Sequence, residues 1–321
     1  MSLRERPVSV DDVPAIVELL AAVERAEPAD EAWSEDEIID EVSGVDIDLT
    51  KGSIAVVDPE DGDRLVGVGV IDIGVPTDVW RAYLFGGVHP DYWHRGIGTR
   101  IVQVLGDQAK VWRDTDHPGL PGELKMWILS GRHGTAALAG ESGFEPWRYF
   151  FRMRRDLEQP VVDVPEPAGY EIRAYRDEDA EAVRLSRNST FADHWGSGPM
   201  DPQRWQQQMV GAPAFRPGFS FVATDATGAI GGFLLAEEFD VETKMHGYRT
   251  GYIALVGSER PARGRGLGSA LVTRSIAAMA ADGCRYSELT VDVESPTGAG
   301  RIYERVGFTT LERNTVTGRR F

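Results

Sequence analysis

One order of segments occurs twice along the 321 residues, and this repetition constrains the fold more than any other feature of the chain. Each copy shows an amphipathic helical pattern, a hairpin pattern, a glycine-rich turn and a closing Gly-Phe pair. These lie at 13–20, 54–73, 95–98 and 143–144 in the first copy, and at 182–185, 219–236, 263–268 and 307–308 in the second. A repeat of this length predicts two tandem copies of one domain.

A proline-rich segment separates the two copies. Residues 159–169 hold three prolines and a glycine, a composition that excludes a helix. We therefore expect an N-terminal domain at 1–160 and a C-terminal domain at 168–321.

The order of elements in each copy predicts the fold class α/β, in its α+β form. A strand and helices are followed by a hairpin, a strand–loop–helix unit and a final strand–helix–strand. Such an order favours a mixed, mainly antiparallel sheet with helices on both faces and one parallel crossover after the glycine-rich turn.

The glycine-rich turn of the second copy reads Arg-Gly-Arg-Gly-Leu-Gly at 263–268. It follows an apolar run at 251–256, typical of a strand, and precedes a helical pattern at 269–281. A turn that opens a helix directs unpaired backbone N–H groups and the positive end of the helix dipole at one point, which suits phosphate. Glycine lets a diphosphate reach the backbone, and Arg263 and Arg265 add donors. The turn is predicted to bind a diphosphate; the alternative is an ordinary tight turn with a basic surface.

A second motif follows. Residues 286–293 alternate as a strand does, and Pro296-Thr297-Gly298 interrupts the chain. Residues 299–306 are typical of a short helix that stops at Gly307.

Together the two motifs resemble the GNAT superfamily of acetyltransferases. Arg-x-x-Gly-x-Gly at a strand-to-helix turn is similar to its coenzyme A loop, and the stretch around Tyr303 resembles Asn-x-x-Ala-x-x-Leu-Tyr-Glu-x-x-Gly-Phe. Ser295 or Pro296 stands where that motif has asparagine. The tandem arrangement resembles the mycothiol synthase-like group of actinobacterial two-domain acetyltransferases, without a match to mycothiol synthase itself.

This resemblance implies acetyl-CoA as the cofactor and a splay between the fourth and fifth strands that admits the pantetheine arm. It also implies that Tyr303 is the general acid that protonates the departing thiolate, a role suited to a phenol that stays protonated at neutral pH. The alternative for Tyr303 is a half-buried packing residue.

The cofactor-binding residues expected from the motifs lie mostly in the second copy, with weaker counterparts in the first. The expected set is Val256, Ser258, Arg263, Gly264, Arg265, Gly266, Leu267, Gly268, Ser269, Ser295 and Arg301, with Val88, Arg95, Gly96, Gly98 and Thr99 in the first copy.

The two copies differ in chemistry. Aligning the Gly-Phe pairs places Ala139 opposite Tyr303, and alanine has no proton to donate. Trp93 and His94 replace the first arginine and glycine of the loop. We therefore place the active centre in the C-terminal domain. The N-terminal domain supports the structure, shapes the substrate cleft or holds a cofactor passively, unless its glycine turn is only a remnant.

The base that deprotonates an incoming amine is less well defined. Glu237 and Glu238, at the end of a predicted strand, are the favoured candidates. Other candidates are Glu259, Asp292, Glu294, Asp193 and His194.

The composition limits the classes of partner and ligand that this chain is expected to bind. A net charge of −17 argues against nucleic-acid binding and suits steering of a cationic amine. The chain has no apolar run long enough for a membrane span, and a cytoplasmic monomer or homodimer is expected. The single cysteine, Cys284, excludes an intrachain disulfide, and the six histidines lack zinc-site spacing, so no metal is expected.

The sequence thus predicts an acetyl-CoA-dependent N-acetyltransferase that transfers the acetyl group directly to the amine of a small acceptor. The alternatives are a non-catalytic acyl-CoA-binding or regulatory protein, and an acyltransferase that uses a hydroxyl acceptor or a longer acyl chain.

Overall fold

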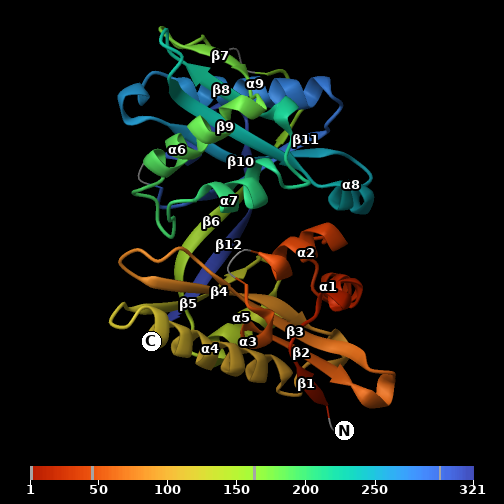
Figure 1. The fold of residues 1–321 in the computed structure, drawn as a ribbon. Coiled ribbons are helices and arrows are strands. Elements are labelled where there is room, and N and C mark those ends of the chain that lie inside the picture. Colours follow the sequence, from red (N-terminus) through yellow and green to blue (C-terminus); the bar gives the residue numbers. More distant parts are fainter. Residues whose placement is uncertain (1–2, 45–46, 162–163, 296–297) are drawn as a thin grey trace. The chain divides into compact units, whose positions relative to one another are not determined.

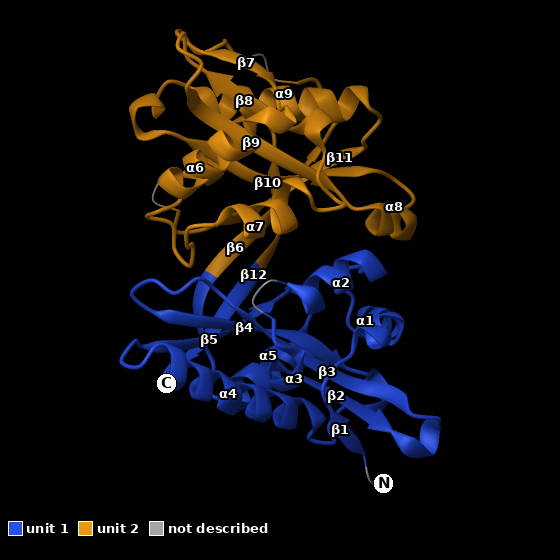
Figure 2. Ribbon diagram, viewed as in Figure 1, with its two compact units in different colours: residues 1–148, 314–321 blue, residues 149–313 orange. Residues whose placement is uncertain are grey.

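The computed structural model describes residues 3–44, 47–161, 164–295 and 298–321. The chain forms two compact units, residues 1–148 with 314–321 and residues 149–313 (Figure 2). The strands of each unit form a mixed region of sheet with helices on both faces, as the order of segments predicts.

Unit 1 contains the elements of the first copy. Its helices are α1 (Val13–Ala26), α2 (Glu35–Ser43), α3 (Leu49–Gly52), α4 (Ile97–Asp116) and α5 (His133–Glu141). Its strands β1 (Arg4–Arg6), β2 (Ser53–Asp58), β3 (Arg64–Ile73), β4 (Trp80–Val88) and β5 (Gly122–Ile128) lie in chain order, and only β4 and β5 pair in parallel.

Unit 2 repeats this plan (Figure 1). Its helices are α6 (Ala180–Thr190), α7 (Pro202–Trp205), α8 (Asp240–His246), α9 (Leu267–Ala281) and α10 (Ala299–Arg305). Its strands β7 (Glu171–Ala174), β8 (Phe221–Thr224), β9 (Ile230–Glu238), β10 (Thr250–Ser258) and β11 (Tyr286–Asp292) also lie in chain order, with β10 and β11 parallel.

The last strand of each unit comes from the other half of the sequence. Residues 150–156 of β6 (Glu145–Asp156) pair with β11, and residues 315–320 of β12 (Thr309–Arg320) pair with β5. The compact units therefore differ from the contiguous segments 1–160 and 168–321. The reason is physical: strand propensity identifies a strand, but the sheet edge that it joins is chosen by tertiary packing.

Helix α9 packs through its apolar side chains on one face of the sheet in unit 2. Leu271, Val272, Ile276 and Met279 are fully buried against residues of β8 to β11. The opposite face packs against α6 and α7 through a second cluster that includes Phe233 and Leu235. The helical periodicity predicted for 269–281 is thus the core-facing stripe of α9.

The parallel pair of unit 2 separates before its strands end. β10 pairs with β11 only from Thr250 to Ile253, although β10 runs on to Ser258 and stays paired with β9. The register with β9 shifts between Ile253 and Leu255, which marks a bulge at Ala254. Residues 254–258 therefore present one backbone edge to an opening between β10 and β11, the splay that the resemblance implies.

Unit 1 has the same opening without the bulge. β4 pairs with β5 only from Trp80 to Leu84, whereas its pairing with β3 continues without a register shift to Val88.

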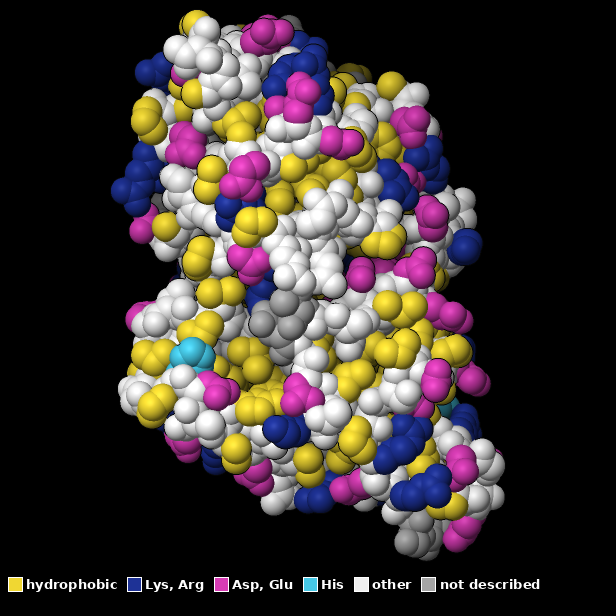
Figure 3. Space-filling model, viewed as in Figure 1, with side chains coloured by type: hydrophobic (Ala, Val, Ile, Leu, Met, Phe, Trp, Pro, Cys, Tyr) yellow, Lys and Arg dark blue, Asp and Glu magenta, His cyan; other side chains and the backbone are white. Residues whose placement is uncertain are grey.

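Among the described helices, none combines the length and apolar character needed to cross a lipid bilayer. On the face drawn in Figure 3, the described basic and acidic side chains are interspersed over both units.

Candidate active site

The turn before α9 leaves a row of backbone donors free. Gly264 and Gly266 have φ of +75° and +86°, the left-handed region that glycine adopts without strain. The amides of residues 264–269 have no acceptor among the described residues, and Ala270 is the first to bond within the helix, donating to Gly266 O at 3.0 Å. A Cβ added at Gly264 or Gly266 would meet nothing within 4 Å, so the turn is open to a ligand.

Arginine side chains without carboxylate partners lie in this turn and in α10. Arg263, Arg265, Arg301 and Arg305 are exposed, and none forms an ion pair with a described residue. Arg263 instead donates through Nε to Ser258 O at 3.2 Å, and the Arg265 guanidinium lies 5.9 Å from the Tyr170 ring. In a chain of net charge −17, unpaired cations at a helix N-terminus make a local anion site.

Tyr303 lies on α10, whose packing brings it to the splay. Ile302 covers the first turn of α9, because a Cβ at Gly268 would lie 3.5 Å from its Cδ1. The Tyr303 ring is buried in the cluster that includes Ile253 and Leu289, the last pair before the strands separate. Burial raises the pKa of Tyr303 well above its usual value, and its hydroxyl has no hydrogen bond to a described residue. The side chain is thus a neutral phenol with a free donor.

Ser295 lies just before α10 and donates its amide to Asp292 O at 3.1 Å. The Pro296-Thr297 part of the predicted chain break lies outside the described residues.

The sequence analysis did not identify a row of side chains near the splay, on the face of the sheet opposite α9. Tyr252 pairs directly with Glu237 of β9 and with Glu288 of β11, so the three side chains share one face. Burial raises the pKa of Tyr252 to about 12. Glu288 is held by Arg152 Nε and Arg154 Nε at 2.6 and 2.5 Å.

Comparing the two copies of the sequence repeat could have identified this row of side chains. In unit 1, Asp72, Tyr83 and Lys125 occupy equivalent paired positions on β3, β4 and β5. An acid opposite a tyrosine therefore occurs at the same place in both copies.

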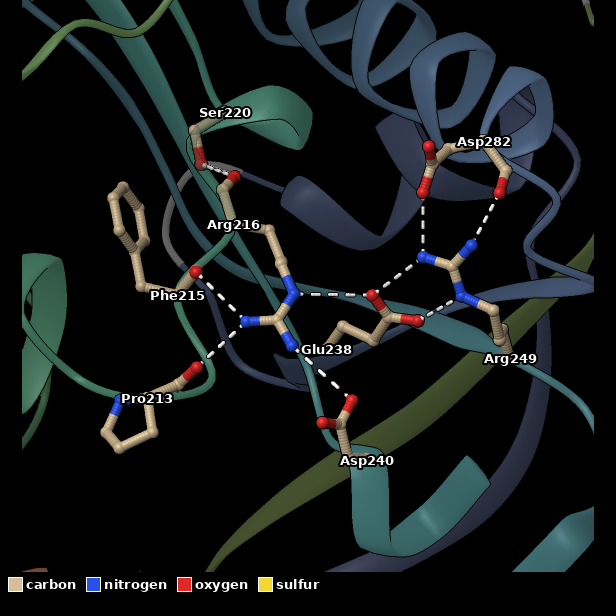
Figure 4. A network of polar contacts seen from close by, with 8 residues as sticks. All are labelled: Pro213, Phe215, Arg216, Ser220, Glu238, Asp240, Arg249 and Asp282. Atoms are coloured by element: carbon tan, nitrogen blue, oxygen red, sulfur yellow. Dashed lines mark hydrogen bonds and ion pairs between the residues drawn. The ribbon is translucent and has the colours of Figure 1, made fainter. Parts of the chain in front are cut away.

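Glu237 and Glu238 point to opposite faces of the sheet, as neighbours on a strand must. Glu237 is half-buried and faces Tyr252. Glu238 is 4% exposed and receives Arg249 Nε and Nη2 at 2.6 and 2.9 Å and Arg216 Nε at 3.3 Å. Figure 4 shows the Arg249 guanidinium between Glu238 and Asp282. The Arg249 bond chiefly holds the pKa of Glu238 below its usual value.

Most of the other candidate bases contact neighbouring groups. Asp193 pairs with Arg260 at 2.5 Å, and Glu259 accepts from the Ser189 hydroxyl at 3.0 Å. Asp292 is buried and accepts the Glu294 amide at 2.9 Å. The His194 ring lies 5.3 Å from Phe191.

Unit 1 retains the loop conformation but not the phenol. His94 and Gly96 have φ of +59° and +78°, matching Gly264 and Gly266. The Trp93 indole donates to Val88 O at 2.7 Å, as Arg263 does to Ser258. Ala139 is buried where unit 2 has Tyr303.

The remaining first-copy residues expected at the cofactor lie at the same turn. Gly98 and Thr99 are in the first turn of α4, and the exposed Arg95 packs 4.6 Å from the Tyr92 ring.

The described residues include neither a reactive thiol nor a cluster of side chains placed to bind a metal ion. Burial raises the pKa of Cys284 to about 11, which keeps its thiol protonated. Within the described part of the chain, no group of three His, Cys, Asp or Glu side chains is placed to hold a metal ion.

The glycine-rich turn, the adjoining splay and the buried phenol are the features that the resemblance implies, and comparison with known proteins identifies the family. Residues 16–115 and 180–308 match the Acetyltransferase (GNAT) family, one match in each half. The chain belongs to this family of acetyltransferases, which use acetyl-CoA as acetyl donor, and carries the GNAT domain in tandem.

Among relatives, the chain is similar to "Mycothiol acetyltransferase" of Thermobispora bispora, with 32% identity over 78% of each chain. The same-named protein of Saccharopolyspora erythraea is 27% identical over 88% of this chain and 91% of its own.

Among solved structures, a GCN5-related N-acetyltransferase from Sphaerobacter thermophilus superimposes with a TM-score of 0.74 and 26% identity over 99% of this chain and 95% of that one. A tandem GNAT protein from the clavulanic acid biosynthesis pathway gives 0.70 at 17% identity over 99% and 98%, a likeness of fold.

Proposed function

We propose that this protein is an acetyl-CoA-dependent N-acetyltransferase that acts on a small amine through unit 2. The observation that carries the proposal is the conjunction of the open turn at 264–269 with Tyr303 at the adjoining splay. Unit 1 has the turn and the splay but has Ala139 in place of the phenol.

Cofactor binding would use the groups that lack protein partners. The amides of residues 264–269, with Arg263 and Arg265, would hold the diphosphate. Val256 and Ser258 lie on the strand edge that borders the splay, where backbone groups can pair with pantetheine and donate to the thioester carbonyl. Ser295 lies just before α10 and Arg301 in its first turn, on the segment that carries Tyr303. Bound acetyl-CoA supplies an activated acetyl thioester.

We assign the two chemical tasks to Tyr303 and Glu237. Tyr303 donates its phenolic proton to the leaving sulfur, because burial keeps the phenol protonated across the physiological range. Glu237 accepts the proton of the amine nitrogen, since it lies opposite Tyr252, close to the point where β10 and β11 separate, on the face opposite α9. Glu238 is unsuited to that task, because its carboxylate is bound by two arginines and its pKa is lowered.

A matched pair of variants separates these two glutamates. Glu237→Gln should lower kcat by about 10²-fold with little change in stability, because it removes the acceptor of the amine proton. Glu238→Gln should lower the free energy of unfolding by about 1–3 kcal/mol and leave turnover per folded molecule unchanged, because it weakens charge-assisted bonds to Arg249 and Arg216. Chemical denaturation and steady-state kinetics check both; equal kinetic losses in the two variants would remove the assignment.

The Glu238 effect should depend on pH with a definite sign. A carboxyl whose folded pKa is lowered adds stability above its unfolded pKa of about 4.3 and loses it as pH falls through the folded pKa. The stability gap between wild type and Glu238→Gln should therefore be full at neutral pH and shrink in acid.

Unit 1 would hold a cofactor without transferring its acetyl group. Its turn offers unpartnered amides at residues 97–99, next to Arg95, Gly96, Gly98 and Thr99, and Val88 ends the bordering strand. Such a unit would have a structural or regulatory role.

The class of the acetyl acceptor is inferred from the relatives of this chain and from its net charge. Relatives of this chain are called mycothiol acetyltransferase, and the net charge of −17 favours the approach of a cationic amine. The test is thiol release from acetyl-CoA with a panel of primary amines, with hydroxyl acceptors and longer acyl-CoA thioesters as comparison arms. Release with an amine is expected. Cofactor binding without release in any arm would favour the non-catalytic protein, and faster release with alcohols or longer chains would favour the other acyltransferases.

A further inference from the structure

The helix that carries Tyr303, α10, ends in a glycine turn. Gly307 has φ of +93°, and its amide donates to Glu304 O at 3.1 Å. The amide of Phe308 donates to Tyr303 O at 3.0 Å. This pair of bonds is a Schellman motif, and it satisfies two of the last carbonyls of the helix. The carbonyl of Val306 is outside the motif, and because Val306 is fully buried, its oxygen needs a donor from another element.

Arg155 of β6 supplies that donor. Its guanidinium donates through Nη1 to Val306 O and through Nη2 to Pro160 O, the latter at 2.7 Å. Arg155 is 2% exposed, and no carboxylate among the described residues forms an ion pair with it. A buried charge is costly unless hydrogen bonds compensate it. Here the bonds join the end of α10 to the chain segment that follows β6.

The oxygen that Arg155 holds is close to the phenol along the helix. Val306 follows Tyr303 by three residues, a spacing that places the two on one side of a helix. Both are buried in the same apolar cluster. With seven residues, α10 is too short to be stable through its own hydrogen bonds. Its contacts with other elements, of which the Arg155 bond is one, therefore determine where the phenol lies.

Unit 1 contains the same arrangement without a phenol. Gly143, with φ of +79°, follows the end of α5, and Arg319 of β12 donates through Nη1 to Ser142 O, the C-cap of that helix, at 2.9 Å. Arg319 pairs with β5 and Arg155 pairs with β11 at equivalent positions of the two parallel pairs. Helix α5 carries Ala139, so Arg319 holds a helix that has no side chain for proton transfer.

We propose that Arg155 is a positioning residue for acetyl transfer, which holds α10 so that the Tyr303 hydroxyl lies at the splay. This inference rests on the proposed function, in which Tyr303 gives a proton to the leaving sulfur. Arg155 belongs to the strand that follows the first copy of the repeat. The first half of the chain therefore contributes a functional contact to unit 2, in addition to an edge strand.

A kinetic test compares Arg155→Met with Arg319→Met, using the amine that turns over fastest in the panel. Methionine has no N–H group, so each variant leaves the carbonyl at one helix end without its donor. Arg155→Met should lower kcat by about 10–100-fold with the KM for acetyl-CoA unchanged, because the phenol is displaced while the turn at 264–269 stays intact. Arg319→Met should lower the denaturation midpoint and keep the wild-type kcat.

Two further variants separate positioning from a general loss of structure. Arg155→Lys keeps a charged donor and should recover part of the lost kcat, since an ammonium replaces the fork of a guanidinium only in part. It also carries the test if Arg155→Met does not fold. Because Arg155 acts through Tyr303, the double variant Arg155→Met with Tyr303→Phe should be no slower than Tyr303→Phe alone.

A spectroscopic test reports the position of the Tyr303 ring without cofactor or turnover. A fluorinated tyrosine at position 303 of the full chain gives a fluorine NMR resonance that is sensitive to the packing around the ring. Arg155→Met and Arg155→Lys should shift this resonance. Arg319→Met should leave it unchanged.

The outcomes separate the positioning role from the function on which it rests. If the Arg155 variants have wild-type kcat and an unshifted resonance, while Tyr303→Phe is slow, the positioning role is overturned and the proposed function stands. Multiplying losses in the double variant, or an equal loss of kcat in Arg319→Met, would also overturn it, because the arginine would then act on the fold as a whole. If no amine is acetylated, or Tyr303→Phe is as fast as wild type, the proposed function and the positioning role both fail.

Discussion

Tyr303→Phe should lower kcat by about 10²–10³-fold while the folded protein stays as stable as wild type. The kinetic loss is expected because the leaving sulfur would have no positioned proton donor. The stability is expected to hold because phenylalanine keeps the packing against Phe308, whose ring centroid is 6.0 Å away. The lost hydroxyl has no hydrogen bond to a described residue, so its removal leaves no partner unsatisfied.

Three measurements define this result: kcat for thiol release, the dissociation constant for acetyl-CoA, and the denaturation midpoint. Only kcat should change. Because burial raises the pKa of Tyr303, wild-type kcat should show no alkaline decline from this group near neutral pH. A variant at full rate would mean that Tyr303 is only a packing residue, and the site would need another acid.

Local signals in the sequence were enough to predict the conformation of the glycine-rich turn at 263–268. The glycines of Arg-Gly-Arg-Gly-Leu-Gly predicted positive φ and open amides, and Gly264 and Gly266 have both. The strand before the loop and the helix after it follow from periodicity, and they appear as β10 and α9. These features depend on residues close together in the chain.

Which side chains lie next to each other on neighbouring strands could not be predicted from local sequence signals. Glu237 and Glu238 are adjacent in sequence, and only the register with β10 tells which faces Tyr252 and which faces Arg249. The bulge at Ala254 leaves no mark in the apolar run 251–256. Both depend on pairing partners far away in the chain.

Strand exchange at the end of each unit is the clearest case of this kind. Both β6 and β12 follow a Gly-Phe pair and were expected to close their own copy. Residues 150–156 instead complete the unit 2 sheet, and 315–320 complete that of unit 1. A pattern of strand residues does not specify which open edge will receive the strand.

Gly266→Val should abolish turnover at ordinary acetyl-CoA concentrations by weakening cofactor binding about 10²-fold or more. Valine strongly disfavours the φ of +86° found at Gly266, a strain of about 1–3 kcal/mol, and it would place a branched side chain among the open amides. Gly228→Val is the control with the same strain. Gly228 has φ of +85° and nothing within 4 Å of an added Cβ, but it lies in the turn between β8 and β9.

Titration calorimetry and native mass spectrometry distinguish a lost site from a weakened fold. Both variants should lose similar stability, whereas only Gly266→Val should lose the acetyl-CoA bound to unit 2. Any molecule that this variant retains would be held by the turn of unit 1, where Gly96 has a matching φ of +78°. If both variants bind and turn over alike, the amides of residues 264–269 do not hold the diphosphate, and the donor site must be sought elsewhere in the chain.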